Sequence, residues 1–141
     1  MSISENQNKD QHALKKAILE VYANISEAFA KLDIDSALSF FADHEDMVKI
    51  SNGLFLQGKE QLAKSWHQRL GGQSSLRIRL ENVEVHRIDD THAWSTADEY
   101  ISMGEQNHKA IVSNIFILEN SEWKILLDHT TYVQSEIVES E

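Results

Sequence analysis

Apolar residues recur at every third or fourth position between residues 12 and 32, the spacing of one face of an α-helix. They are Leu14, Ile18, Val21, Ile25, Phe29 and Leu32. A second, short helix is predicted after Asp35, whose carboxylate can accept hydrogen bonds from the first free N–H groups of a helix. Helical spacing returns over residues 58–70, and the following pair Gly71-Gly72 is typical of a helix end.

The remaining chain alternates apolar and polar residues, which predicts β-strands. The alternation changes parity between Leu80 and Val83, so we expect a β-bulge near Glu81 and Asn82 that bends the sheet. Asn52-Gly53 is a strong signal for a tight hairpin turn. Strands are expected over residues 47–51, 54–57, 76–85, 91–103, 108–119 and 122–133.

This order of elements predicts the fold class. Four strands follow the last helix without another helix between them, which excludes a sheet built from βαβ units. We expect an α+β domain in which a curved, mixed or antiparallel sheet forms a cone around three helices and encloses a pocket. The expected organisation is a flexible N-terminus (1–11), a single domain (12–133) and a loose acidic tail (134–141).

Composition narrows the classes of partner and chemistry. The 141 residues carry 23 acidic and 13 basic side chains, a net charge of -10, so neither nucleic acid nor an anionic membrane is an expected partner. The chain has no cysteine, which excludes disulfides, thiolate catalysis and cysteine metal sites. With no apolar leader and no membrane-length apolar run, we expect a cytoplasmic protein. The histidine spacing indicates no metal site, and no phosphate-binding loop points to a cofactor.

Three segments resemble the SnoaL-like branch of the nuclear transport factor 2-like superfamily. They are AFAKLDIDSALSFFADH (28–44), LFLQGKEQLAKSW (54–66) and SEWKILLDHTTY (121–132). The resemblance spans roughly residues 12–133 and implies a cone-shaped domain with a pocket between helices and sheet. It also implies a homodimer formed through the outer face of the sheet. It does not imply one activity, because this superfamily includes isomerases, cyclases, dehydratases, hydrolases and non-catalytic association modules.

The resemblance to ketosteroid isomerase can be tested position by position. That enzyme requires a carboxylate base on the first strand, whereas residues 47–51 of this chain contain no acid and have Lys49 or Ile50 at the matching position. The position of its oxyanion tyrosine falls near Ile25, one turn after Tyr22, and its second oxyanion acid falls near Asn114. Steroid isomerase chemistry is therefore not expected.

His129 is the preferred catalytic candidate, with Asp98 or Asn114 assisting. We expect the last strand to turn Trp123, Ile125, Leu127, His129 and Thr131 inward. A histidine in the pocket can act as a general base near neutral pH, and a nearby carboxylate would orient it. The alternative is that His129 makes only a structural hydrogen bond.

The candidate ligand-binding residues are Tyr22, Trp66, Trp94, Tyr100, Asn114 and Leu127. The strand over residues 91–103 has no cleanly apolar face. We favour the parity that turns Trp94, Asp98 and Tyr100 inward. The other parity would present Ala93, Ser95, Ala97, Glu99 and Ile101.

These observations predict a SnoaL-like protein whose pocket binds a small apolar or mixed ligand. Acid/base catalysis of the isomerase, cyclase or dehydratase type is one use of such a pocket, and whether a reaction is catalysed is left open. The alternative is a non-catalytic ligand-sensing or dimeric association module. A pocket filled by Trp66, Trp94, Trp123 and Phe116 would favour this alternative.

Overall fold

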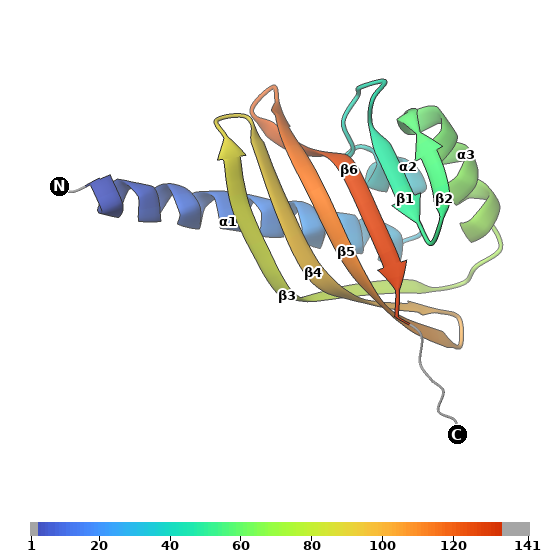
Figure 1. Ribbon diagram of the computed structural model, residues 1–141. Helices are drawn as coiled ribbons and strands as arrows, with labels where there is room; N and C mark the ends of the chain where they lie inside the picture. Colours follow the sequence, from blue (N-terminus) through green and yellow to red (C-terminus); the bar gives the residue numbers. More distant parts are fainter. Residues whose placement is uncertain (1–2, 134–141) are drawn as a thin grey trace.

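Three helices cover one face of a six-stranded sheet in the computed structural model, which describes residues 3–133 (Figure 1). The elements are α1 (Ile3–Ala30), α2 (Ile34–Leu38), β1 (Val48–Ser51), β2 (Leu54–Gln57), α3 (Gly58–Leu70), β3 (Leu76–Asp89), β4 (His92–Met103), β5 (Gln106–Glu119) and β6 (Glu122–Tyr132). This arrangement confirms the predicted α+β class with helices on the concave face.

The strand order is β2-β1-β6-β5-β4-β3. Every neighbouring pair is antiparallel except β1 and β6, which run parallel. The strands β3 to β6 follow one another as hairpins, so only β1 reaches its neighbour through a long connection. The sheet is therefore mixed, and it places the early β1 beside the last strand of the chain.

Two helix starts differ from the sequence prediction. The helix α1 begins at Ile3 rather than at residue 12. Asp33, not Asp35, is the N-cap of α2, because its Oδ1 accepts a hydrogen bond from the Ser36 N–H at 3.1 Å. Asp35 lies inside the first turn instead. The predicted acidic tail lies outside the described residues.

Two β-bulges of the sheet affect the pocket, and a further register shift lies between Arg87 and Asp89 near the end of β3. The first is the predicted one, since the β3–β4 register shifts between Glu81 and Glu84 and Asn82 has a positive φ of 55°. The second was not predicted. Ile115 pairs with Leu127 and Phe116 pairs with Ile125, which leaves Leu126 as the extra residue of β6. This second bulge reverses which residues of β6 face inward after Ile125.

The apolar stripe of α1 packs against the concave face of the sheet. Tyr22 meets Phe116 of β5 edge to face, with ring centroids 5.7 Å apart. At the other end, the Trp66 ring of α3 meets Phe29 at 5.0 Å and Phe41 at 5.4 Å. These aromatic contacts hold α3 against α1 and leave space between the two helices and the bent sheet.

Candidate functional site

A pocket that is partly open to solvent lies between the helices and the concave face of the sheet. Its walls are mostly apolar. The helices contribute Ile25, Phe29, Trp66 and Leu70, and the bent parts of β3 and β4 contribute Leu76, Ile78, Leu80, Ile101 and Met103. A concave pocket with mostly apolar walls and a few polar groups suits one small, largely apolar molecule.

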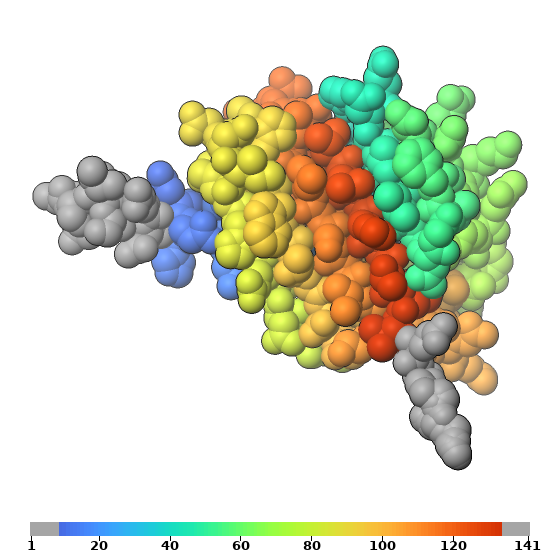
Figure 2. Space-filling view, viewed as in Figure 1, coloured from blue at the N-terminus to red at the C-terminus, as the bar shows by residue number. Residues whose placement is uncertain are grey.

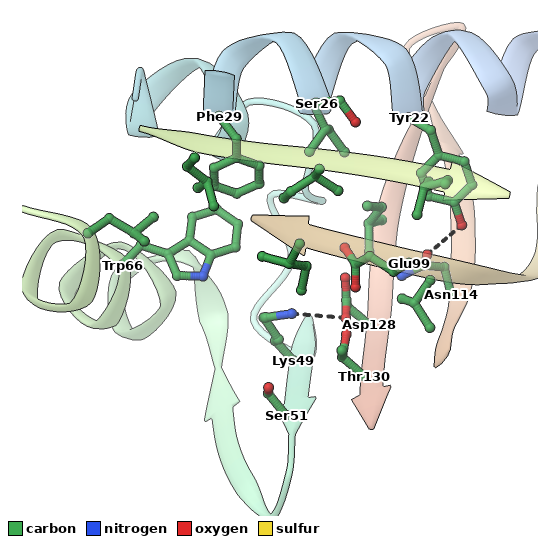
Figure 3. Close-up of a pocket in the computed structure, with 18 of the residues that line it drawn as sticks. Tyr22, Ser26, Phe29, Lys49, Ser51, Trp66, Glu99, Asn114, Asp128 and Thr130 are labelled. Carbon is green, nitrogen blue, oxygen red and sulfur yellow. Dashed lines mark hydrogen bonds and ion pairs between the residues drawn. The ribbon is translucent and has the colours of Figure 1, made fainter. Parts of the chain in front are cut away.

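Polar side chains cross the floor of the pocket in one row. Ser95 of β4 pairs in register with Asn114 of β5, Asn114 with Asp128 of β6, and Asp128 with Lys49 of β1. All four side chains face the helices, because neighbouring residues in register lie on the same face of a sheet. Figure 3 shows Asn114, Asp128 and Lys49 together with Glu99 around a common space.

Lys49 and Asp128 form a largely buried ion pair. The Lys49 Nζ donates to Asp128 Oδ1 at 3.0 Å, and the side chains are only 13% and 12% exposed. The Thr130 hydroxyl also donates to Asp128 Oδ1, at 2.9 Å. Burial of either charge alone would be costly, so the contact between the two side chains offsets the cost of taking them out of water. The first strand thus supplies a cation to the pocket.

Tyr22 of α1 is hydrogen-bonded to the other half of the row. Its hydroxyl donates its single proton to Asn114 Oδ1 at 2.5 Å. The Tyr22 oxygen therefore accepts the hydrogen bond that the Ser95 hydroxyl donates. The Asn114 Nδ2 in turn donates to the carbonyl oxygen of Leu127 at 3.3 Å, beside the β6 bulge. Burial raises the pKa of the Tyr22 phenol above its ordinary range, so this group stays protonated.

Glu99 of β4 also lines the pocket but takes part in none of these hydrogen bonds and ion pairs. Burial in the pocket and, to a smaller extent, the Asp128 carboxylate raise the pKa of Glu99, and the Lys49 ammonium opposes them; the net pKa is about 7. Among the described residues, no hydrogen bond or ion pair engages the Glu99 carboxyl. This carboxyl can therefore gain or lose a proton near neutral pH, as a general acid/base must.

Three predicted ligand residues line the pocket: Tyr22, Trp66 and Asn114. Contact of these residues with a ligand stays a prediction. Glu99, Lys49 and Asp128 are not among the predicted site residues. For Lys49 and Asp128 the available signal was a charged residue between apolar or uncharged neighbours, whereas Glu99 follows the charged Asp98 and carried no such signal.

The predicted parity of β4 is wrong. Trp94 lies on the outer face, where its ring stacks on His86 at 4.3 Å. Tyr100 lies there as well, 4.4 Å below the Arg79 guanidinium, and Asp98 accepts a hydrogen bond from the Asn82 side chain at 2.8 Å. The opposite parity faces inward, with Ala93, Ser95, Ala97, Glu99 and Ile101. The small Ala93 and Ala97 are 0% and 4% exposed, because residues of this size allow the core to pack closely on the strand.

The predicted inward orientation of His129 and Leu127 is also wrong. The extra residue Leu126 shifts the parity of β6, so Asp128 and Thr130 face inward while His129 is exposed on the outer face. Leu127 lies on that outer face too, and only its carbonyl contacts a pocket residue. No hydrogen bond or ion pair found among the described residues joins His129 to Asp98.

Neither a membrane-spanning helix nor a cluster of metal-binding side chains is found in the described residues. Within residues 3–133, no helix is long and apolar enough to cross a membrane. In the same part of the chain, no three acidic or histidine side chains are grouped closely enough to hold a metal ion.

Comparison with known proteins identifies the family. A family model described as a SnoaL-like domain matches residues 18–133. No curated protein is significantly similar to the chain. Similar solved structures include a proposed dehydratase of the NTF2-like family from Streptomyces avermitilis, with a TM-score of 0.76, 18% identity and coverage of 92% of this chain and 99% of that chain.

Two further structures share the fold. A proposed scytalone dehydratase from Novosphingobium aromaticivorans has a TM-score of 0.79 at 11% identity, with 94% of each chain covered. A proposed association domain of calcium/calmodulin-dependent protein kinase type II from Thiobacillus denitrificans has a TM-score of 0.70 at 19% identity, covering 81% of this chain and 93% of that chain. With the family model matching most of its length, the chain belongs to the SnoaL-like domain family and has the nuclear transport factor 2-like fold.

Proposed function

We propose that the pocket catalyses proton transfer on a small, largely apolar molecule that bears a carbonyl group. The observation that carries this proposal is Glu99, a carboxyl with a pKa of about 7 inside an apolar pocket. A general acid/base works best when its pKa lies near the working pH, which an ordinary glutamate does not achieve. The two proposed dehydratases of the same fold are consistent with this class of chemistry.

The proposed step begins with ionised Glu99 removing a proton from the carbon next to the carbonyl. The electron pair of the broken C–H bond moves to the carbonyl oxygen and forms an enolate. The Lys49 ammonium is the cation that stabilises this oxygen, because it retains N–H groups beyond the one that Asp128 accepts. If the substrate has a β,γ double bond, protonated Glu99 then returns the proton to the γ-carbon of the conjugated enolate. If it has a β-hydroxyl group, Glu99 gives the proton to that group, which leaves as water while the enolate electron pair forms the new C=C bond.

Deuterium exchange tests the proposal without knowledge of the natural substrate. A panel of small apolar ketones and β-hydroxy ketones is incubated with the protein in D2O and examined by NMR. We expect at least one compound to incorporate deuterium next to its carbonyl, and Glu99→Gln to abolish the incorporation. The matched control is Asp98→Asn, which neutralises the neighbouring residue on the opposite face of β4 and should leave exchange unchanged. Exchange that persists in Glu99→Gln would remove Glu99 from this role.

A second proposal concerns the outer face of the sheet, which Figure 2 shows as one broad surface over β3, β4, β5, β6 and β1. An apolar row crosses it through Trp94, Ile115, Leu127 and Val48, which pair in register on four neighbouring strands. Trp94 is 40% exposed, and nearby Ile111 is 51% exposed. Exposed apolar area of this kind favours association, so we also propose that two copies pair through this face.

Sedimentation tests this second proposal. The wild-type chain should sediment as a dimer, and Ile111→Glu should shift it to the monomer, because a charge would be buried in the interface. A wild-type monomer at high protein concentration would contradict the proposal. It would leave the catalytic proposal untouched.

A further inference from the structure

Arg69 lies on the face of α3 that borders the pocket. Trp66, Arg69 and Leu70 are spaced by three and four residues, so they share one face of the helix, and all three line the pocket. Trp66 is buried against Phe29 and Phe41 and anchors this face. Arg69 itself is exposed, which places its guanidinium where the pocket meets solvent.

Arg69 also differs from Lys49, the other cation that lines the pocket. Lys49 and Asp128 neutralise each other at 3.0 Å, and Glu99 is the third ionisable carboxyl or amine along the lining. None of the carboxylates in the described residues lies within 4.0 Å of the Arg69 guanidinium. The last turn of a helix favours a cation, so the charge is well tolerated there without a protein partner.

The position of Arg69 would matter for an anionic ligand. With a net charge of -10, the chain repels anions over most of its surface, so an anion needs a local cation at the pocket. A guanidinium presents two parallel N–H donors to a carboxylate, a geometry that an ammonium does not offer.

We propose that Arg69 binds a carboxylate of the pocket ligand, and that the ligand is an apolar keto acid. In this arrangement the carboxylate lies at the mouth beside Arg69, the apolar body lies against the Trp66 wall, and the carbonyl reaches Lys49 and Glu99. The placement of the carbonyl rests on the proposed proton-transfer function. The carboxylate subsite at Arg69 does not depend on turnover and can be measured by binding alone.

The probes are ω-(4-acetylphenyl)alkanoates with spacers of increasing length, each compared with its own methyl ester. Binding is measured by isothermal titration calorimetry with wild-type protein, with Arg69→Gln and with Lys64→Gln. The Lys64 variant removes the same charge from an exposed position of α3 that does not line the pocket. Deuterium incorporation into the acetyl group is followed in the same samples.

We expect at least one acid to bind wild-type protein about fivefold or more tightly than its ester. Arg69→Gln should remove this preference without weakening the ester, and Lys64→Gln should preserve it. Equal binding of every acid and ester, or a preference that survives in Arg69→Gln, would overturn the subsite. If the preference is found but no acetyl group exchanges deuterium in any sample, the subsite stands and the proton-transfer proposal fails on this panel. If an acetyl group exchanges deuterium but no acid binds more tightly than its ester, the proton-transfer proposal stands and the carboxylate subsite fails.

Discussion

Replacement of Glu99 with glutamine should stabilise the folded protein increasingly as the pH rises. In the folded protein the pKa of Glu99 is about 7, against an ordinary value of 4.5. The folded state therefore binds more protons than the unfolded state between these two values, and stability falls as the pH rises through the interval. Below about pH 4.5 the carboxyl is protonated in both states and costs nothing.

The magnitude follows from the two pKa values. Each pKa unit corresponds to about 1.4 kcal/mol, so ionised Glu99 costs up to about 3 kcal/mol once the pH exceeds 7. Glutamine has nearly the same shape and no charge, so Glu99→Gln should remove this cost. The expected difference in free energy of unfolding is near zero at about pH 4 and approaches about 3 kcal/mol at about pH 8.

Urea unfolding measures this difference. Fluorescence of the buried Trp66 can follow unfolding of wild-type and variant protein across the pH range. Comparison of the two proteins at each pH cancels the titration of the groups that they share. Asp98→Asn, on the outer face of the same strand, should show no such pH-dependent gain. A difference that does not grow with pH, or a variant that is less stable at about pH 8, would refute the reasoning.

Three other variants test the remaining contacts of the site. Lys49→Met should destabilise the protein by about 3 kcal/mol at neutral pH in urea unfolding, since it leaves the Asp128 carboxylate buried without its cation. The double variant Lys49→Met/Asp128→Asn should recover part of this loss. No recovery would mean that the charge of Asp128 is not the cause of the destabilisation. Asn114→Leu should cost about 1–3 kcal/mol because the buried Tyr22 hydroxyl loses its acceptor, and an unchanged thermal midpoint would contradict that bond. His129→Ala should change stability by less than about 0.5 kcal/mol and leave binding of pocket ligands unchanged, because the side chain is exposed on the outer face; a loss of ligand binding would contradict this orientation.

The two bulges explain which parts of the sheet could be predicted. Near Asn82 the apolar residues on either side have a clear alternation, so the change of parity is visible in the sequence. At Leu126 the surrounding residues Ile125 and Leu127 are also apolar, and a continuous apolar run carries no alternation from which to read a shift. The orientation of His129 was predicted wrongly for this reason.

The faces of β4 were ambiguous for a different reason. Both parities mix apolar and polar side chains, and the inward face is marked by small residues such as Ala93 and Ala97 rather than by large apolar ones. Large apolar residues are the usual sequence signal for a buried face. Where a strand packs closely against the core, as β4 does at Ala93 and Ala97, its inward positions accommodate only small residues. Glu99 was therefore assigned to the disfavoured face.

The sequence by itself determined the order of helices and strands, the α+β class, the Asn52-Gly53 turn and the bend at Asn82, because each depends on spacing within a few neighbouring residues. Only the tertiary structure decided which polar side chains share the pocket. Lys49 and Asp128 are 79 residues apart and meet because β1 pairs in parallel with β6, beyond the bulge that turns Asp128 inward. Local periodicity carries no information about such a pairing, since the contact between distant strands depends on how the whole sheet assembles around its core.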